Sequence, residues 1–132
     1  MSQENVEIIR RFVAAWNRGD LDAALAYFDP ECEVVFQPNV PEPGPFHGHA
    51  ELRQWVDGFR SAWDSHRAEV VQAEHADDRV LAILRLIGRG MGSSIETDDQ
   101  QPHVFTLRRG LIIRWQSFSE AAEARRAAGL SE

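Results

Sequence analysis

The chain contains 132 residues, of which 43% are hydrophobic and 27% are charged, and its formal net charge is −7. This length predicts one domain over residues 1–132, and the excess of acids excludes the clustered basic surface that binds nucleic acid or an anionic membrane. The opening segment MSQENVEIIRR lacks the basic and then apolar order of a signal peptide, so we expect a cytoplasmic protein. Cys32 is the only cysteine, which excludes an intrachain disulfide and a cysteine-based zinc site.

Two helices are predicted at the start of the chain. Apolar side chains follow one helical stripe through residues 2–18, and Gly19 is expected to end this helix. Asp20 then caps a shorter predicted helix, in which apolar side chains recur at helical spacing as far as Phe28. The two helices should therefore meet at a tight corner.

A strand, a loop and a third helix are predicted next. Residues 32–37 are β-branched and aromatic, which favours a strand, whereas the proline-rich residues 38–48 favour a loop. From His49 the apolar side chains recur at helical spacing as far as Trp63. The expected third helix thus has an unusually aromatic face.

The rest of the chain predicts an antiparallel meander and a terminal helix. Strands are expected over residues 67–76, 80–87, 95–108 and 111–118. Turns are expected at Asp77-Asp78 and at Arg109-Gly110, and the terminal helix over residues 119–128. Helices followed by an antiparallel sheet indicate an α+β fold.

Three segments in this order resemble SnoaL-like polyketide cyclases and ketosteroid isomerases, which share the fold of nuclear transport factor 2. They are RFVAAWNRGDLDAALAYFDPECEVVF (residues 11–36), PFHGHAELRQWV (45–56) and VFTLRRGLIIRWQSF (104–118). The resemblance implies a cone-shaped, cystatin-like fold, in which a strongly bent, mostly antiparallel sheet wraps around three helices, with a short C-terminal helix added. It also implies a homodimer, which the apolar runs 80–87 and 111–113 suit.

The catalytic residues of these families are not reproduced in this sequence. Ketosteroid isomerases use a tyrosine, a basic aspartate and a protonated aspartic acid around a ketone. The resemblance places Phe12 at the tyrosine, Gln37 at the basic aspartate, and His103, or Val104 one place later, at the second acid. SnoaL-like cyclases carry an acid after a tryptophan of the last strand, where this chain has Arg-Trp-Gln-Ser over residues 114–117. The resemblance therefore implies a pocket more directly than either reaction.

His103 and Gln37 are the candidate catalytic residues. An imidazole can donate to a carbonyl or accept a proton near neutral pH, and the amide of Gln37 can orient a carbonyl but cannot act as a base. The alternative for His103 is a structural role, because it lies between a proline and an apolar strand.

Large aromatic side chains are the candidate ligand-binding residues. They are Phe12, Trp16, Trp55, Phe59, Trp63, Phe105 and Trp115. Sites for flat, ring-shaped molecules are mostly apolar and aromatic, so these side chains are candidates to hold a small hydrophobic molecule. The alternative is that the same stripe simply fills the core.

The remaining motifs do not indicate a metal, dinucleotide or hydrolase site. The pair His47 and His49 has a metal-like spacing but no evident third ligand, and we expect neither a metal nor a cofactor. The glycines of residues 88–92 do not open a helix, so a dinucleotide-binding loop is not indicated. Ser93, Ser94 and Ser117 lack partners for a hydrolase triad.

Three functions remain open at this point. The first is a cofactor-free cyclase or isomerase that acts on a small hydrophobic ketone. The second is a module that binds such a molecule without reaction, and the third is a homodimeric association domain whose cone is filled by its own side chains.

Overall fold

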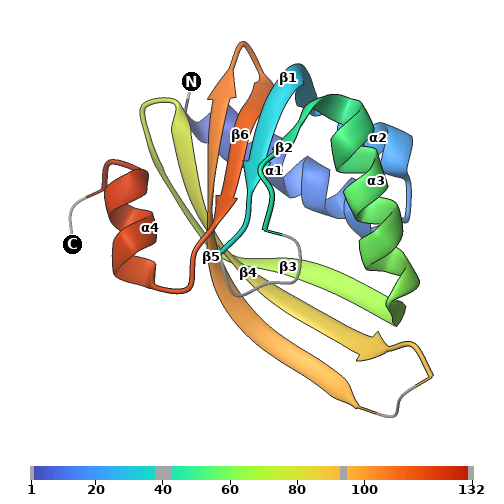
Figure 1. Cartoon of the computed structure of the whole chain (residues 1–132). Coiled ribbons are helices and arrows are strands. Elements are labelled where there is room, and N and C mark those ends of the chain that lie inside the picture. The colour runs from blue at the N-terminus through green and yellow to red at the C-terminus, as the bar shows by residue number, and fades with distance from the viewer. Residues whose placement is uncertain (1, 38–42, 93–94, 131–132) are drawn as a thin grey trace.

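The computed structural model describes residues 2–37, 43–92 and 95–130 (Figure 1). The helices are α1 (Ser2–Asn17), α2 (Leu21–Leu25), α3 (Gly48–Ser61) and α4 (Ala121–Ala127). The strands are β1 (Phe28–Val35), β2 (Phe46–His47), β3 (Trp63–Ala76), β4 (Arg79–Gly90), β5 (Glu96–Arg108) and β6 (Leu111–Ser117).

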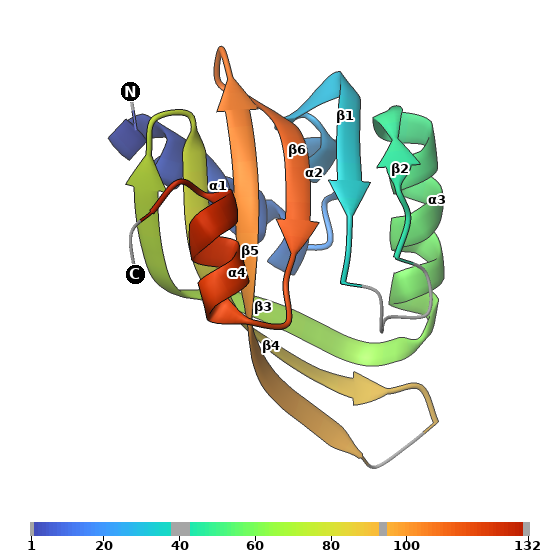
Figure 2. The same ribbon diagram turned by 60° about the vertical axis from the view of Figure 1, so that its left-hand side comes forward.

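The strands form one six-stranded sheet in the order β2-β1-β6-β5-β4-β3. The β1–β6 pair is parallel, and the other neighbouring pairs are antiparallel. The sheet bends strongly, with α1, α2 and α3 on its concave side and α4 on its convex side (Figures 1 and 2). The α+β fold that the resemblance implied, with a bent sheet around three helices and a C-terminal helix, is confirmed.

Aromatic side chains join α1 to the concave face of the sheet. The ring of Phe12 meets Phe28 at a centroid distance of 5.1 Å and Trp115 at 5.5 Å, both edge to face. Such pairs add about 0.5–1.5 kcal/mol to the stabilisation that comes from burying the rings. Phe12 is thus a core residue as well as a residue of the concave face.

The helical spacing had predicted that Phe28 belongs to the second helix. This prediction was wrong. Phe28 begins β1, where it pairs with Ile112, and the carbonyl of Tyr27 accepts a 2.8 Å hydrogen bond from the backbone of Ile112. This strand pairing outweighs the local helical pattern, which is only a weak preference. Helix α2 is consequently a single short turn that ends at Leu25.

The predicted third helix was also too long at its C-terminal end. Helix α3 ends at Ser61, and Trp63 instead starts β3, where it pairs with Gly90. The backbone N–H of Met91 donates to the carbonyl of Ala62 at 2.9 Å, which fixes this junction. In the stretch predicted as a loop, residues 46–47 form β2, whereas residues 38–42 lie outside the described part of the chain.

The predicted cap and turns are confirmed. A side-chain oxygen of Asp20 accepts a 3.1 Å hydrogen bond from the backbone N–H of Ala23. The turns between strands have positive φ at Asp77 (52°), at Arg109 (55°) and at Gly110 (79°).

Part of the convex face is covered and part is charged. Helix α4 packs Ala124 and Ala128 against Leu81 and Val104 of the sheet. Farther along the same strands, Arg85 makes two hydrogen bonds to Asp98, at 2.8 and 2.6 Å, and an ion pair with Glu69 at 3.5 Å. The apolar runs that suggested a homodimer are thus partly occupied within the chain, and the homodimer stays a prediction.

Two further features bear on the class of protein. No helix among the described residues is both long enough and apolar enough to span a membrane. Cys32 is fully buried on β1, and this burial, with a smaller contribution from the charge of Asp29, raises the pKa of its thiol. The thiol is therefore a poor nucleophile.

Replacing the cap of α2 tests how far this short helix depends on Asp20. Asp20→Ala removes the acceptor for Ala23 and should lower the free energy of unfolding by about 1 kcal/mol, measured by urea denaturation. Asp20→Asn keeps a side-chain oxygen at the cap and should cost much less. Equal losses in the two variants would contradict the capping role.

Candidate functional site

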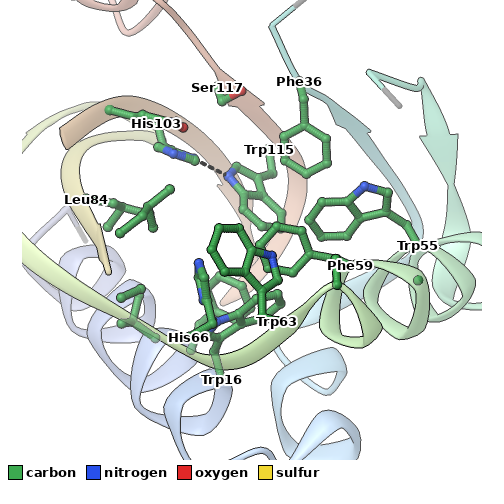
Figure 3. Close-up of a pocket in the computed structure, with 17 residues that line it drawn as sticks. Trp16, Phe36, Trp55, Phe59, Trp63, His66, Leu84, His103, Trp115 and Ser117 are labelled. Atoms are coloured by element: carbon green, nitrogen blue, oxygen red, sulfur yellow. Dashed lines mark hydrogen bonds between the residues drawn. The ribbon is translucent and has the colours of Figure 1, made fainter. Parts of the chain in front are cut away.

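A cavity of about 400 Å³ lies between the concave face of the sheet and helices α1 and α3 (Figure 3). Its volume falls within the range of roughly 300–1,000 Å³ that is usual for small-molecule sites. Its wall contains the side chains of Val13 from α1, Leu84 and Leu86 from β4, and Ala68 from β3. Most of the rest of the wall is aromatic.

The aromatic wall comes from segments that are distant in the sequence. Its members are Phe12, Trp16, Phe36, Trp55, Phe59, Trp63 and Trp115. Trp55 is central to it, because its ring lies 4.5 Å from Phe36 and stacks on Phe59 at 5.1 Å between centroids. These rings therefore support one another in a defined arrangement.

Most of the candidate ligand-binding residues lie on this wall, but Phe105 does not. Phe105 is fully buried and does not line the cavity, although its ring stacks on that of the lining residue Trp115 at 5.6 Å. Phe36, which was not among the predicted ligand-binding residues, does line the cavity. It directly precedes Gln37 at the end of β1, and the bend of the sheet brings it to Trp55.

His103 lies on β5 and lines the cavity, with only 4% of its surface exposed. Its Nδ1 accepts a 2.8 Å hydrogen bond from Nε1 of Trp115, drawn as the dashed line in Figure 3. Because an indole nitrogen only donates, Nδ1 is unprotonated and the ring hydrogen is on Nε2. Burial lowers the pKa of His103 to about 3, so the imidazole is neutral near pH 7.

The surroundings of His103 favour one of its two predicted roles. Its Nε2 is buried and has no hydrogen-bond partner among the described residues. A buried N–H without a partner costs about 1–3 kcal/mol, which a ligand oxygen could recover. The lone pair of Nδ1 is already occupied by Trp115, so His103 is suited to donate a hydrogen bond and poorly suited to take up a proton.

Gln37 is next to the cavity but is not part of its wall. It is 8% exposed, and its backbone N–H donates a 3.0 Å hydrogen bond to Oγ of Ser117. Ser117 does line the cavity and lies opposite His103 in the β5–β6 ladder. The two candidate catalytic residues are therefore connected through Ser117.

His66 lines the same cavity and was not identified from the sequence. Its Nδ1 accepts a 3.3 Å hydrogen bond from Nε1 of Trp16, and its ring meets Phe59 edge to face at 4.9 Å. Burial, and secondly the positive charge of Arg60, lower its pKa. The sequence pattern had predicted that this strand begins at residue 67, whereas β3 begins at Trp63, so His66 had been assigned to no element and to no face.

The polar part of the wall contains no carboxylate among the residues that the structure describes. It consists of His66, Gln101, His103 and Ser117. The acids that the family resemblance implies thus have no counterpart in the described lining, in agreement with the sequence. An apolar cavity with neutral donors suits a neutral, oxygen-bearing molecule better than a cation.

The imidazole of His49 and the backbone of His47 each have a hydrogen-bond partner within the fold. Nε2 of His49 donates to the carbonyl of Phe28 at 2.8 Å, and the backbone N–H of His47 donates to the carboxylate of Glu51. Within the described ranges, no three or more metal-ligating side chains are grouped to hold an ion. Ser93 and Ser94 lie outside those ranges.

Comparison with protein families and solved structures gives a consistent result. The sequence profile of the SnoaL-like domain matches residues 9–115. No curated protein matches the chain significantly.

Three solved structures illustrate the likeness. An NTF2-like protein of unknown function from Burkholderia pseudomallei has 18% identity and a TM-score of 0.81, with 97% of this chain and 98% of that chain covered. TerC, co-crystallised with polyporic acid, has 17% identity and a TM-score of 0.80, with 96% and 98% covered. A provisionally named polyketide cyclase from Sinorhizobium meliloti has 21% identity and a TM-score of 0.71, with 85% and 94% covered. At these identities the likeness shows a common fold.

The buried, neutral state of His103 predicts a pH dependence of stability. Its pKa is about 3 in the folded protein, against an ordinary value of 6.5, so between these values the unfolded chain binds the proton and the folded chain does not. The free energy of unfolding should therefore fall as the pH drops from about 6.5 towards 3, by up to about 1.4 kcal/mol per unit. Urea denaturation across this range should show a shallower slope in His103→Asn, and parallel profiles would contradict this prediction.

The ring of Trp63 packs against Gly88, where the absence of a side chain makes room for it. A Cβ at residue 88 would lie 2.6 Å from the six-membered ring of Trp63 and 3.1 Å from the carbonyl oxygen of Ser65. Gly88→Ala should therefore displace this part of the wall and cost about 1–3 kcal/mol, measured by denaturation. The cost should be smaller in a Trp63→Ala background, because the clash with the ring is then absent and only the approach to the carbonyl of Ser65 remains.

Gly58→Ala is the matched control for this substitution. Gly58 lies inside α3, where an added Cβ meets nothing within 4 Å, so the change should stabilise the protein by about 0.5–1 kcal/mol. If Gly88→Ala lowers the free energy of unfolding equally with and without Trp63, the ring of Trp63 is not what excludes a side chain at residue 88.

Proposed function

The chain belongs to the SnoaL-like domain family, and on this basis we propose that its cavity binds a small, neutral, polycyclic ketone-type metabolite. The observation that carries the proposal is the buried Nε2–H of His103, which has no partner among the described residues and lies in a mostly aromatic and aliphatic cavity. A ligand carbonyl would satisfy this donor, and the flat wall would cover the rings of the ligand.

The size and polarity of the cavity support the same class of ligand. Its volume of about 400 Å³ accommodates several fused rings, and its few polar groups are neutral. TerC, which has the same fold, was crystallised with polyporic acid. We therefore include polyporic acid among the probes, beside steroid and aromatic polyketide ketones.

A second candidate function is cofactor-free proton transfer beside the bound carbonyl, as in a cyclase or isomerase. The neutral His103 favours it, because a fixed donor at a carbonyl oxygen also stabilises the enolate that develops when an adjacent proton leaves. The provisional name of the S. meliloti relative points in the same direction. The absence of a carboxylate in the described lining leaves the base unassigned, so binding without reaction is the simpler function.

Binding is tested by native mass spectrometry and thermal shift with these probes. Leu84 is buried and lines the cavity, so Leu84→Trp should fill it and abolish the ligand-induced shift. Val71→Trp is the matched control, because Val71 is 51% exposed and does not line the cavity, and it should retain the shift. An unresponsive wild-type protein would contradict the proposal and favour an association domain with a filled cone.

Reaction is tested separately from binding. Any ketone that binds is incubated with the protein in deuterium oxide, and exchange of the hydrogens beside its carbonyl is followed by mass spectrometry. Catalysis predicts exchange that is faster than in buffer and that is lost in His103→Asn, because the carbonyl then lacks its donor. Binding without accelerated exchange would reject the enzyme and leave the binding module.

A further inference from the structure

The cavity contains the same arrangement twice. In each case a tryptophan Nε1–H donates to Nδ1 of a histidine: Trp115 to His103 at 2.8 Å, and Trp16 to His66 at 3.3 Å. All four side chains line the cavity. The two pairs come from different elements, since Trp115 and His103 lie on β6 and β5 whereas Trp16 and His66 lie on α1 and β3.

Each tryptophan fixes the tautomer of its histidine. An indole N–H has no acceptor capacity, so the Nδ1 that it reaches must be unprotonated, and the hydrogen of each neutral ring is on Nε2. Both rings are held in the uncharged form by burial, and for His66 also by Arg60, whose guanidinium lies 5.5 Å from the ring centre of Trp16. The cavity therefore has two imidazoles that can donate a hydrogen bond through Nε2 and cannot accept one at Nδ1.

The two donors lie at separate places on one face of the sheet. His103 pairs with Ala82 of β4, and His66 pairs with Gly88 of the same strand. Residues directly opposite in an antiparallel ladder share a face, and the six residue steps from Ala82 to Gly88 span at most about 20 Å along the curved strand. Leu84 and Leu86 lie between them on β4 and line the cavity, so an apolar floor separates the two donors, as Figure 3 shows for Leu84.

From this arrangement we propose that the ligand is an elongated polycyclic molecule with a hydrogen-bond acceptor, such as a carbonyl oxygen, near each end, one held by His103 and the other by His66. This inference rests on the proposed function, and it specifies the ligand as two-ended. Trp115 and Trp16 act as positioning residues, because each holds its imidazole in the donating tautomer. A ligand with one carbonyl would leave one donor without an acceptor, and would bind more weakly for that reason.

A series of ligands on one skeleton tests this on the unaltered protein. The probes are androst-4-ene-3,17-dione, the two monoketones that each lack one of its carbonyls, and the hydrocarbon that lacks both. Affinities are measured by quenching of the tryptophan fluorescence and by calorimetry. Each carbonyl should improve the affinity by roughly three- to tenfold, and the two gains should be nearly independent.

Variants then assign each carbonyl to its donor. His103→Asn and His66→Asn each keep an oxygen that can accept from the tryptophan, and each lack the group at Nε2. Each variant should lose the gain from one carbonyl and retain the gain from the other. Trp115→Phe and Trp16→Phe keep both imidazoles but no longer fix the hydrogen on Nε2. They should lower the affinity for the dione more than the affinity for the hydrocarbon.

Imidazole ¹⁵N NMR gives a readout that does not depend on the variants. In the free wild-type protein, both histidines should show a protonated Nε2 and an unprotonated Nδ1, and the dione should shift both Nε2 signals. Each monoketone should shift one of them.

The outcomes separate the two levels of the proposal. If the hydrocarbon and the ketones bind equally well and neither Nε2 signal moves, the cavity binds hydrophobic molecules, but both the ketone-type ligand of the proposed function and the two-ended ligand are wrong. If only the His103 signal responds, the role of His66 is overturned. If no member of the series and no probe of the earlier panel binds, the proposed function and this inference both fail.

Discussion

The hydrogen bond from Trp115 to His103 connects the core of this protein to its cavity. One side of the Trp115 ring stacks on the fully buried Phe105, and its edge meets Phe12 of α1, so the indole cannot turn without disturbing the packing of helix on sheet. Its N–H is consequently aimed at His103 with little freedom, at 2.8 Å. In a low-dielectric interior such a bond is stronger than in water, and so is the cost of losing it. The chemistry that His103 can offer is therefore set by the packing of residues behind it.

The same constraint explains why a cavity without carboxylates is still polar in a specific way. Burying an ionised acid without a partner would cost far more than burying a neutral imidazole, and the described lining contains only neutral polar groups. Charged side chains lie instead on the outside of the fold, for example in the hydrogen-bonded pair of Arg85 and Asp98 on the convex face, where water screens them. Within the fold this separates a charged exterior from an interior whose polarity comes from oriented N–H groups.

The sequence predicted much of the fold and only part of the site. Hydrophobic periodicity located α1, α3 and the main strands, because each buries one face against the same core. It misplaced Phe28 and Trp63, because a helical stripe can be continued by a strand that buries the same side chain, and only the pairing with β6 and β4 decides between them. His66 was missed for the same reason, since its face is defined only once β3 is known to begin at Trp63. His103 and most of the aromatic wall were identified, whereas the bend of the sheet, which puts Phe36 on the wall and leaves Phe105 off it, has no signal in local sequence.

The parallel pairing of β1 with β6 has a consequence for how the chain is synthesised. Apart from the two-residue β2, β1 has no partner strand until residues 111–117 have left the ribosome, although β1 is made within the first third of the chain. The edge of β1 therefore stays unpaired while most of the polypeptide is still being added, and contacts of such long sequence separation form slowly. The aromatic wall, which needs Phe36 and Trp115 side by side, is assembled only when the last strand docks. Premature termination before β6 would thus produce a nascent chain with an unpaired strand and no complete cavity, a natural substrate for chaperones and proteases.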